Sequence, residues 1–190
     1  MKKSILYFFI LFTMHSNVYS FSTSAEQAII YDVETKTVIF EKNADDLMSP
    51  SSMSKLMTVY YIFKKLSDGE IKLSDKFTVS KKAWKKGGSR MFLNVGSQIS
   101  IDELLRGIIV QSGNDACITI AEGFSGSEEN FASELNSLAH DIGLTNSNFT
   151  NATGWPDPEH LMTSRDIMKL SVRTIEDFPE LYKIYSEKEY

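Results

Sequence analysis

Two residues near the start of the chain have the types and spacing for nucleophilic chemistry. Ser52 and Lys55 are three positions apart at the start of an expected helix, which places both side chains on one face. A serine hydroxyl attacks well only when a base takes its proton, and a partly buried lysine with a lowered pKa can be that base. N–H groups at a helix start favour the negative charge that develops. The pair therefore predicts a serine nucleophile with lysine as its general base.

The Ser-x-x-Lys pattern is common, so it is weak evidence by itself. A chain with this content of serine and lysine is expected to contain about two such pairs by chance. The alternative interpretation is a serine that caps a helix, followed by a solvated lysine.

A second polar motif, Ser112-Gly113-Asn114, lies in a break between two apolar segments. A break between helices can present side chains inward. Ser112 would relay a proton between Lys55 and a leaving group, and Asn114 would hydrogen-bond an amide of the substrate. The alternative is an ordinary turn between helices, where Ser, Gly and Asn are frequent for backbone reasons.

The order of these motifs is typical of a known group of enzymes. Ser-x-x-Lys followed by Ser-x-Asn occurs in penicillin-binding proteins and β-lactamases. The chain resembles more closely the D-alanyl-D-alanine carboxypeptidases, the low-molecular-weight penicillin-binding proteins. The stretches that carry this resemblance are 50–58, 88–92, 102–107, 112–116, 151–154, 157–160, 164–166 and 185–190. They are spread along the chain from residue 50 to residue 190, and the resemblance as a whole extends over nearly the whole chain after residue 20.

The resemblance implies a fold and a reaction. The fold would be the α+β, β-lactamase/transpeptidase-like fold, here a helical lobe with an N-terminal β-hairpin. The enzyme would attack the terminal peptide bond of a peptidoglycan stem peptide ending in D-Ala-D-Ala, release D-Ala and hydrolyse the acyl-enzyme with water. β-Lactams would act as inhibitors that mimic this substrate.

The resemblance also assigns a role to each motif residue. Ser52 would be the acylated nucleophile, Lys55 its general base, and Ser112 a proton relay. Asn114 would position the substrate. The backbone N–H of Ser52 would be one donor of the oxyanion hole.

The third motif of the family, Lys-Thr-Gly, does not follow Asn114. The nearest match is Ala152-Thr153-Gly154, which lacks the lysine and is expected in a loop. The family places this motif on a sheet strand, so we expect residues 21–190 to be a truncated catalytic domain with an incomplete antiparallel sheet. The alternatives are a cross-link endopeptidase or β-lactam hydrolase that uses the same nucleophile, an inactive remnant, or an unrelated exported helical domain with chance motifs.

Residues 1–20 have the pattern of a secretory signal peptide. Lys2 and Lys3 precede an apolar run from Ile5 to Met14, and small residues follow near position 20. We therefore expect an exported protein of the periplasm or cell envelope. Membrane association is expected only through an uncleaved signal or a missing C-terminal anchor.

The composition indicates a globular protein without an anionic polymer as partner. The chain is 42% hydrophobic and 12% aromatic, and its net charge is -5. The first 20 residues hold two of the 20 basic residues and no acidic ones, so the remainder carries a net charge of -7. Nucleic acid is not an expected partner, because there is no basic excess to neutralise phosphates. The lysines at 81, 82, 85 and 86 are interpreted as a solvated helix end and turn, and the alternative is a binding patch.

Hydrophobic periodicity and capping signals predict the secondary structure. A capping box is expected at Ser100 and Glu103. The expected elements are a β-hairpin at 27–42, a helix from near 52, a polar loop at 67–100 with a strand at 76–79, and helices at 100–110, from 115, at 127–142, at 163–175 and at 179–185.

The remaining reactive residue types are interpreted as structural. Cys117 is expected to be a small buried helix residue. His140 and His160 show no metal-ligand spacing and are expected to be ordinary polar residues. Two Asn-x-Thr sites, at Asn148 and Asn151, are interpreted as turns. No metal and no cofactor are predicted.

Overall fold

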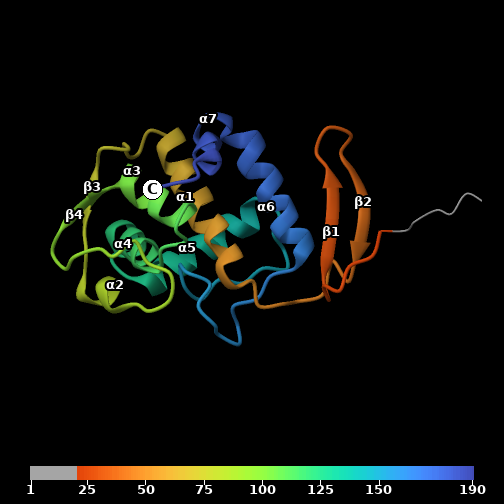
Figure 1. Ribbon diagram of the computed structural model, residues 1–190, viewed down its shortest axis with the longest axis horizontal. Helices are drawn as coiled ribbons and strands as arrows, with labels where there is room; N and C mark the ends of the chain where they lie inside the picture. Colours follow the sequence, from red (N-terminus) through yellow and green to blue (C-terminus); the bar gives the residue numbers. More distant parts are fainter. Residues whose placement is uncertain (1–20) are drawn as a thin grey trace, which may run out of the picture.

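A computed structural model describes residues 21–190, so the predicted signal peptide at 1–20 lies outside the described residues. The strands are β1 (Ala28–Asp32), β2 (Thr37–Lys42), β3 (Lys76–Thr78) and β4 (Gln98–Ser100). The helices are α1 (Lys55–Ser67), α2 (Lys81–Lys85), α3 (Ile101–Ile109), α4 (Asn114–Ser125), α5 (Glu128–Asp141), α6 (Ser164–Asp177) and α7 (Pro179–Tyr182). Figure 1 shows a helical body with the β1–β2 hairpin standing beside α6. The predicted α+β class is confirmed.

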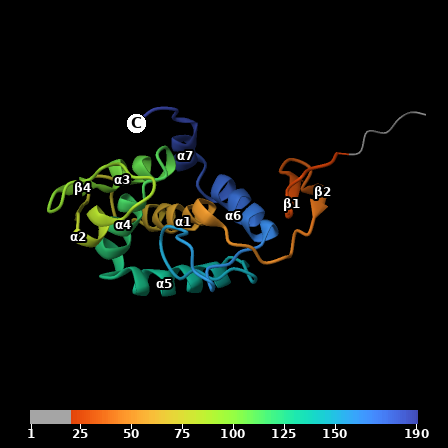
Figure 2. The same ribbon diagram turned by 60° about the horizontal axis from the view of Figure 1, so that its bottom comes forward.

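Helix α1 is the centre of the hydrophobic core. It contacts α3, α5 and α6, and Figure 2 shows it running between α5 and α3. Residues 57 to 63 of α1 are all buried, because this helix is covered on nearly every side. The ring of Tyr60 lies edge-on to Phe178, with 5.1 Å between ring centroids. Burial of this segment fixes where the helix start, and with it Lys55, must lie.

The β1–β2 hairpin has the predicted extent. The strands pair antiparallel from Ala28 opposite Lys42 to Asp32 opposite Thr37, with a bulge after Ile30. In the turn, the Asp32 carboxylate accepts the backbone N–H groups of Glu34 and Thr35. This local bonding satisfies donors that the tight turn would otherwise expose.

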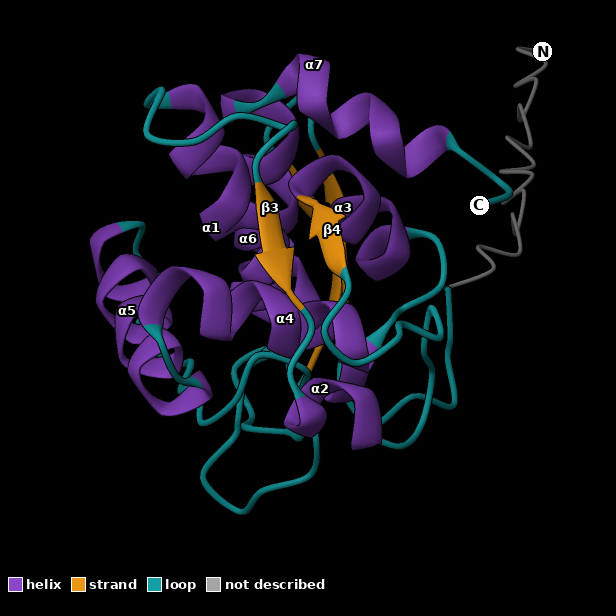
Figure 3. Cartoon of the chain, turned by 90° about the vertical axis from the view of Figure 1, so that its left-hand side faces the viewer, coloured by secondary structure: helices purple, strands orange, loops and turns teal. Residues whose placement is uncertain are grey.

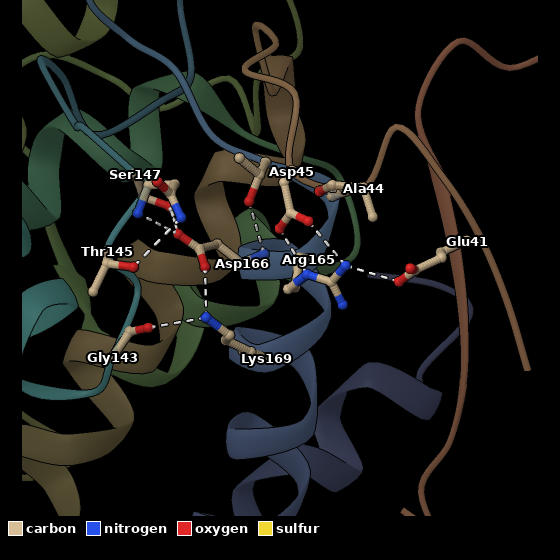
Figure 4. Close-up of polar contacts among 12 residues, drawn as sticks. Glu41, Ala44, Asp45, Gly143, Thr145, Ser147, Arg165, Asp166 and Lys169 are labelled. Carbon is tan, nitrogen blue, oxygen red and sulfur yellow. Dashed lines mark hydrogen bonds and ion pairs between the residues drawn. The ribbon is translucent and has the colours of Figure 1, made fainter. Parts of the chain in front are cut away.

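Arg165, in the first turn of α6, anchors the hairpin to the helical body (Figure 4). Its Nε donates to Asp45 Oδ1 at 2.7 Å, and its Nη2 donates to Glu41 Oε2 at 2.8 Å. Its backbone N–H donates to the carbonyl of Ala44 at 3.0 Å. The planar guanidinium suits this two-sided contact, so the stretch 164–166 has a structural role at the edge of the hairpin.

The next residue, Asp166, is fully buried and joins α6 to the loop that follows α5 (Figure 4). Its carboxylate accepts the N–H of Asn146 at 2.8 Å and the hydroxyl of Ser147 at 3.0 Å. Lys169 supplies the positive charge, at 3.0 Å, and also donates to the carbonyl of Gly143. The burial of this carboxylate is tolerated because these hydrogen bonds replace the ones that water would make to it.

Most helix predictions agree with the structure, and the capping box at Ser100 and Glu103 is present. Two elements inside the predicted polar loop were missed. One is α2, whose N-terminus is capped by the Ser80 hydroxyl accepting the N–H of Ala83 at 3.0 Å. The other is β4, which pairs antiparallel with β3 (Figure 3). Both are too short for periodicity to reveal. Within residues 21–190, no helix combines the length and apolar character of a membrane span.

The start of α1 differs from the prediction. The regular helix begins at Lys55, and Ser51–Ser54 form a 3-10 turn before it. None of these serine side chains caps the helix. Ser52 is therefore exposed on a turn, while Lys55 is buried at the first helical position.

Candidate active site

The predicted pair of Ser52 and Lys55 is in direct contact. Lys55 Nζ donates to Ser52 Oγ at 2.9 Å. The Lys55 residue is 5% exposed, and this burial lowers the pKa of its amine because a buried ammonium loses hydration. The alternative of a solvated lysine is wrong. A lysine with a lowered pKa, bonded to an exposed serine, has the geometry of a general base beside a nucleophile.

A cavity of about 460 Å³ opens beside this pair. Ser112 lines it from the break between α3 and α4, so the structure places all three predicted catalytic residues around one space. The rest of the lining is largely apolar and comes mainly from α1, α3 and α6. It consists of Met53, Leu56, Val59, Ile108, Ile109, Ile167, Ser171, Thr174, Ile175, Tyr182 and Tyr185. A few polar groups in an apolar wall are typical of ligand cavities.

Two serines have strained backbones, one next to Ser52 and one in the cavity wall. Ser51, next to the nucleophile, has φ of 49°, and Ser112 has φ of 57°. Residues other than glycine rarely adopt this left-handed conformation, so surrounding contacts must hold it. One such contact follows Ser112, where the N–H of Gly113 donates to the carbonyl of Gly107 at 2.9 Å. Strain of this kind concentrates at functional sites.

Asn114 is the first residue of α4 and is buried, but it does not line the cavity. Its Nδ2 donates to the carbonyl of Gly87 at 2.8 Å. Its backbone N–H donates to the carbonyl of Ser89, also at 2.8 Å. These two hydrogen bonds hold the loop containing Gly87 and Ser89 against the start of α4. The sequence did not predict this role for Asn114.

Asp115 is a second residue that holds this loop, and it was absent from the predicted site. Its buried carboxylate accepts the N–H of Met91 at 3.0 Å and that of Leu93 at 3.1 Å. Hydrogen bonds to a carboxylate are stronger than those between neutral groups. An acidic residue directly after Asn114, followed by the apolar residues Ala116, Cys117 and Ile118, is the signal that would have identified it.

His160 supports the turn that carries Ser52, so the expectation of an ordinary polar residue missed its role. The ring is buried, and its Nε2 lies 2.7 Å from Ser54 Oγ. Its Nδ1 accepts the backbone N–H of Thr150 at 3.1 Å. Because Nδ1 is an acceptor, the proton of the neutral ring is on Nε2, which donates to Ser54. Burial lowers the pKa of His160, which favours this neutral form.

The loop containing Ala152 and Gly154 packs against the 3-10 turn that carries Ser52. Thr58 Oγ1, on α1, donates to the carbonyl of Ala152 at 2.8 Å. Gly154 has φ of +73°, and a Cβ at this position would collide with the carbonyl of Ser51. Asn151 accepts the N–H groups of Thr153 and Trp155, as expected of a turn residue. Residues 151–154 therefore support the Ser52 turn by packing and do not supply the Lys-Thr-Gly motif.

Cys117 is buried in α4, as predicted. Burial raises the pKa of its thiol to about 12, so at neutral pH it is not a nucleophile. Among residues 21–190, no group of three or more His, Cys, Asp or Glu side chains is arranged to hold a metal ion.

The chain is similar to characterised carboxypeptidases over most of its length. The family described as D-alanyl-D-alanine carboxypeptidase, peptidase S11, matches residues 13–190. The D-alanyl-D-alanine carboxypeptidase DacC of Escherichia coli is 40% identical over an alignment of 185 residues, and the match covers 94% of this chain and 46% of DacC. The chain thus spans about half the length of the curated relatives it matches.

Solved structures show the same relationship. Penicillin-binding protein 5 of Haemophilus influenzae has a TM-score of 0.87 and 36% identity, over 91% of this chain and 51% of that protein. Penicillin-binding protein D2 of Listeria monocytogenes, solved in its ampicillin-bound form, has a TM-score of 0.78 and 25% identity, over 88% of this chain and 68% of that protein. The fold is therefore transpeptidase-like. With matched motifs, fold and sequence, this chain belongs to the D-alanyl-D-alanine carboxypeptidase family, peptidase S11.

Proposed function

We propose that this chain carries the nucleophilic half of a serine D-Ala-D-Ala carboxypeptidase, with Ser52 as the nucleophile. The observation that carries the proposal is the 2.9 Å hydrogen bond between Ser52 and the buried amine of Lys55. Burial disfavours the charged form of Lys55, and a neutral amine can take the hydroxyl proton as Ser52 attacks.

The proposed reaction has two steps. Ser52 Oγ bonds to the carbonyl carbon between the two D-Ala residues, the C–N bond breaks, and Ser112 passes a proton to the departing amine of D-Ala. Water then attacks the ester, releases the shortened peptide and restores the Ser52 hydroxyl. The exposed position of Ser52 allows access to both the peptide and water.

Two further groups would hold the substrate. The backbone N–H of Ser52 would stabilise the oxyanion. Asn114 lies outside the cavity lining and its Nδ2 is occupied by Gly87, so its Oδ1 would accept an N–H of a substrate that extends beyond the cavity. β-Lactams would acylate Ser52 in the same way, consistent with the ampicillin-bound relative. A stem-peptide substrate also favours a protein that acts in the cell envelope.

Covalent labelling tests the nucleophile directly. The purified chain is incubated with a fluorescent penicillin, digested, and the labelled peptide identified by mass spectrometry. We expect label on Ser52, none in Ser52→Ala, and full labelling in Ser51→Ala, which removes the neighbouring exposed hydroxyl. Label elsewhere, or unchanged label in Ser52→Ala, would refute this assignment.

Product analysis separates the possible reactions. Release of free D-Ala from a stem pentapeptide supports the carboxypeptidase. Cleavage of cross-linked dimers or rapid turnover of the penicillin would instead support the endopeptidase or the β-lactam hydrolase. If the folded chain neither takes up label nor releases D-Ala, the proposal fails for this chain, and the alternative of an inactive remnant is correct.

A further inference from the structure

One segment of this acidic chain is strongly basic. Between Asp75 and Asp102 there is no acidic residue, although the chain as a whole has a net charge of -5. The same segment holds six basic residues, which are Lys76, Lys81, Lys82, Lys85, Lys86 and Arg90. Segregation of charge on this scale creates a local positive field on a negative protein.

Large apolar side chains are exposed in the same segment. Phe92 is 76% exposed, Val95 is 52% exposed and Trp84 is 46% exposed. Single exposed apolar residues are ordinary, but three of this size in a segment that holds six cations need a reason.

Helix α2 turns its charged face outward. Its buried residue, Ala83, packs in the core, and α2 contacts α4. With 100° per residue, Lys81 and Lys85 lie opposite Ala83, and Trp84 lies at the edge of that outer face. Figure 3 shows α2 beyond the C-terminal end of β3.

The turn that contains Val95 returns to the start of α2. The N–H of Gly96 donates to the carbonyl of Val79, and the N–H of Val79 donates to the carbonyl of Ser97, both at 2.9 Å. Val79 is two residues before α2, so Val95 lies beside the start of that helix. Lys81, Trp84, Lys85, Arg90, Phe92 and Val95 all lie on this one segment, and we call their side chains together the basic aromatic surface.

The protein holds Phe92 outward by its backbone. The N–H groups of Met91 and Leu93, on either side, donate to the buried carboxylate of Asp115. Between them Phe92 has φ of 60°, a conformation rare for a bulky residue. Arg90 lies 4.9 Å from the centroid of the Phe92 ring. The exposure of this ring is therefore fixed by structure and is not the result of a loose loop.

Three cations of the segment have no acidic partner among the described residues. Lys82 pairs with Glu128 at 3.0 Å, and Lys86 lies 4.1 Å from the centroid of the Trp155 ring. Within residues 21–190, Lys81, Lys85 and Arg90 form no ion pair. Their charges are free to meet an external anion.

We propose that the basic aromatic surface binds the interface of an anionic phospholipid bilayer. Lysine and arginine attract acidic headgroups, while Trp and Phe insert at headgroup depth. A purely ionic polymer partner would use the cations but would leave the fixed exposure of Phe92 and Val95 without a function. The proposal goes beyond the catalytic one and does not depend on it, and it departs from the sequence-based expectation that only a signal peptide or an anchor would contact the membrane.

The test measures contact between Trp84 and lipid in the full chain carrying Trp155→Phe, so that Trp84 is the remaining tryptophan. The chain is mixed with phosphatidylcholine vesicles, with and without phosphatidylglycerol, whose acyl chains carry bromine as a quencher. We expect quenching and a blue shift of Trp84 only with phosphatidylglycerol. This local signal reports the surface itself, whatever residues 1–20 contribute.

Charge reversal provides the matched comparison. Lys81→Glu with Lys85→Glu should lower partitioning roughly tenfold or more, because four units of charge are lost at the interface. The control, Lys72→Glu with Lys188→Glu, makes the same change at exposed lysines outside the surface. Phe92→Ser should reduce quenching without unfolding, because the side chain is exposed.

Several outcomes would overturn the proposal. One is the absence of binding to anionic vesicles, and another is binding without quenching of Trp84. A third is an equal loss of partitioning in the Lys81/Lys85 and Lys72/Lys188 double variants. Equal binding to soluble polyglutamate, with no quenching by lipid, would identify an anionic polymer as the partner.

Discussion

The imidazole of His160 hydrogen-bonds the hydroxyl of Ser54 at 2.7 Å, which joins residues 106 positions apart in the chain. Ser54 is the last residue of the 3-10 turn that carries Ser52. The other ring nitrogen accepts the N–H of Thr150, so the turn is tied to a distant loop through one neutral side chain. The position of the proposed nucleophile therefore depends on a segment that contributes no catalytic group.

This relationship predicts a pH-dependent stability. The folded state lowers the pKa of His160, whereas the unfolded side chain titrates near 6.5. Below about pH 6.5 the unfolded state binds more protons, so this contribution to the free energy of unfolding falls as pH falls, by up to about 1.4 kcal/mol per pH unit. Urea titrations at pH 7.5, 6.5 and 5.5 measure this change in the free energy of unfolding.

His160→Gln should flatten this dependence and cost about 1–3 kcal/mol at pH 7.5, because buried partners lose a hydrogen bond. His140→Gln is the matched control, since the His140 side chain is exposed. An unchanged pH slope in His160→Gln would contradict the neutral, buried assignment.

The contact of Gly154 with the carbonyl of Ser51 predicts a position-specific cost of adding one methyl group. Gly154→Ala should destabilise the fold by more than the roughly 1–2 kcal/mol of a left-handed alanine, because its Cβ also collides with Ser51. Penicillin labelling of Ser52 should slow as the turn shifts. Thermal unfolding and the labelling rate measure both effects.

Gly143→Ala is the control for this comparison. Gly143 also has a positive φ, of 83°, but an added Cβ would meet no atom within 4 Å. It should show the conformational cost alone, with unchanged labelling. Equal effects at the two glycines would refute a specific contact at Gly154.

The buried amine of Lys55 predicts how acylation depends on pH. Since burial lowers its pKa below the usual 10.5, the neutral form increases as pH rises and accounts for half of the population at some pH below 10.5. The rate of penicillin labelling should rise with pH along the same curve. Lys55→Arg should lower the rate about a hundredfold or more, because arginine keeps its proton.

Lys64→Arg serves as the control, at a lysine whose exposed side chain pairs with Asp68. It should leave the labelling profile unchanged. A wild-type rate independent of pH, or normal labelling in Lys55→Arg, would exclude Lys55 as the base.

The Asp115 carboxylate predicts a local loss of order when it is neutralised. Asp115→Asn should destabilise the chain by about 1.5–3 kcal/mol, because hydrogen bonds to a charged acceptor are replaced. Amide hydrogen exchange at Met91 and Leu93 should accelerate most. Asp141→Asn, at an exposed side chain, should change neither quantity; protected amides in Asp115→Asn would count against the proposed anchoring.

Local elements were predictable because their signals lie within a few residues. The hairpin follows from two apolar stretches around a polar turn, and the start of α3 follows from the capping box at Ser100 and Glu103. The short α2 and β4 were missed, since neither is long enough to show a period. The 3-10 turn at Ser52 was missed because serine is also a common helix cap.

The sequence by itself determined the family resemblance, the α+β class and the proximity of Ser52 to Lys55, which are three residues apart. Only the tertiary structure decided which distant residues support them. It buried Lys55, brought Ser112 to the same cavity, turned Asn114 toward Gly87 and placed His160 against Ser54. The physical reason is range: capping and periodicity act between neighbours, whereas burial and hydrogen bonds across tens of residues exist only after the helices pack.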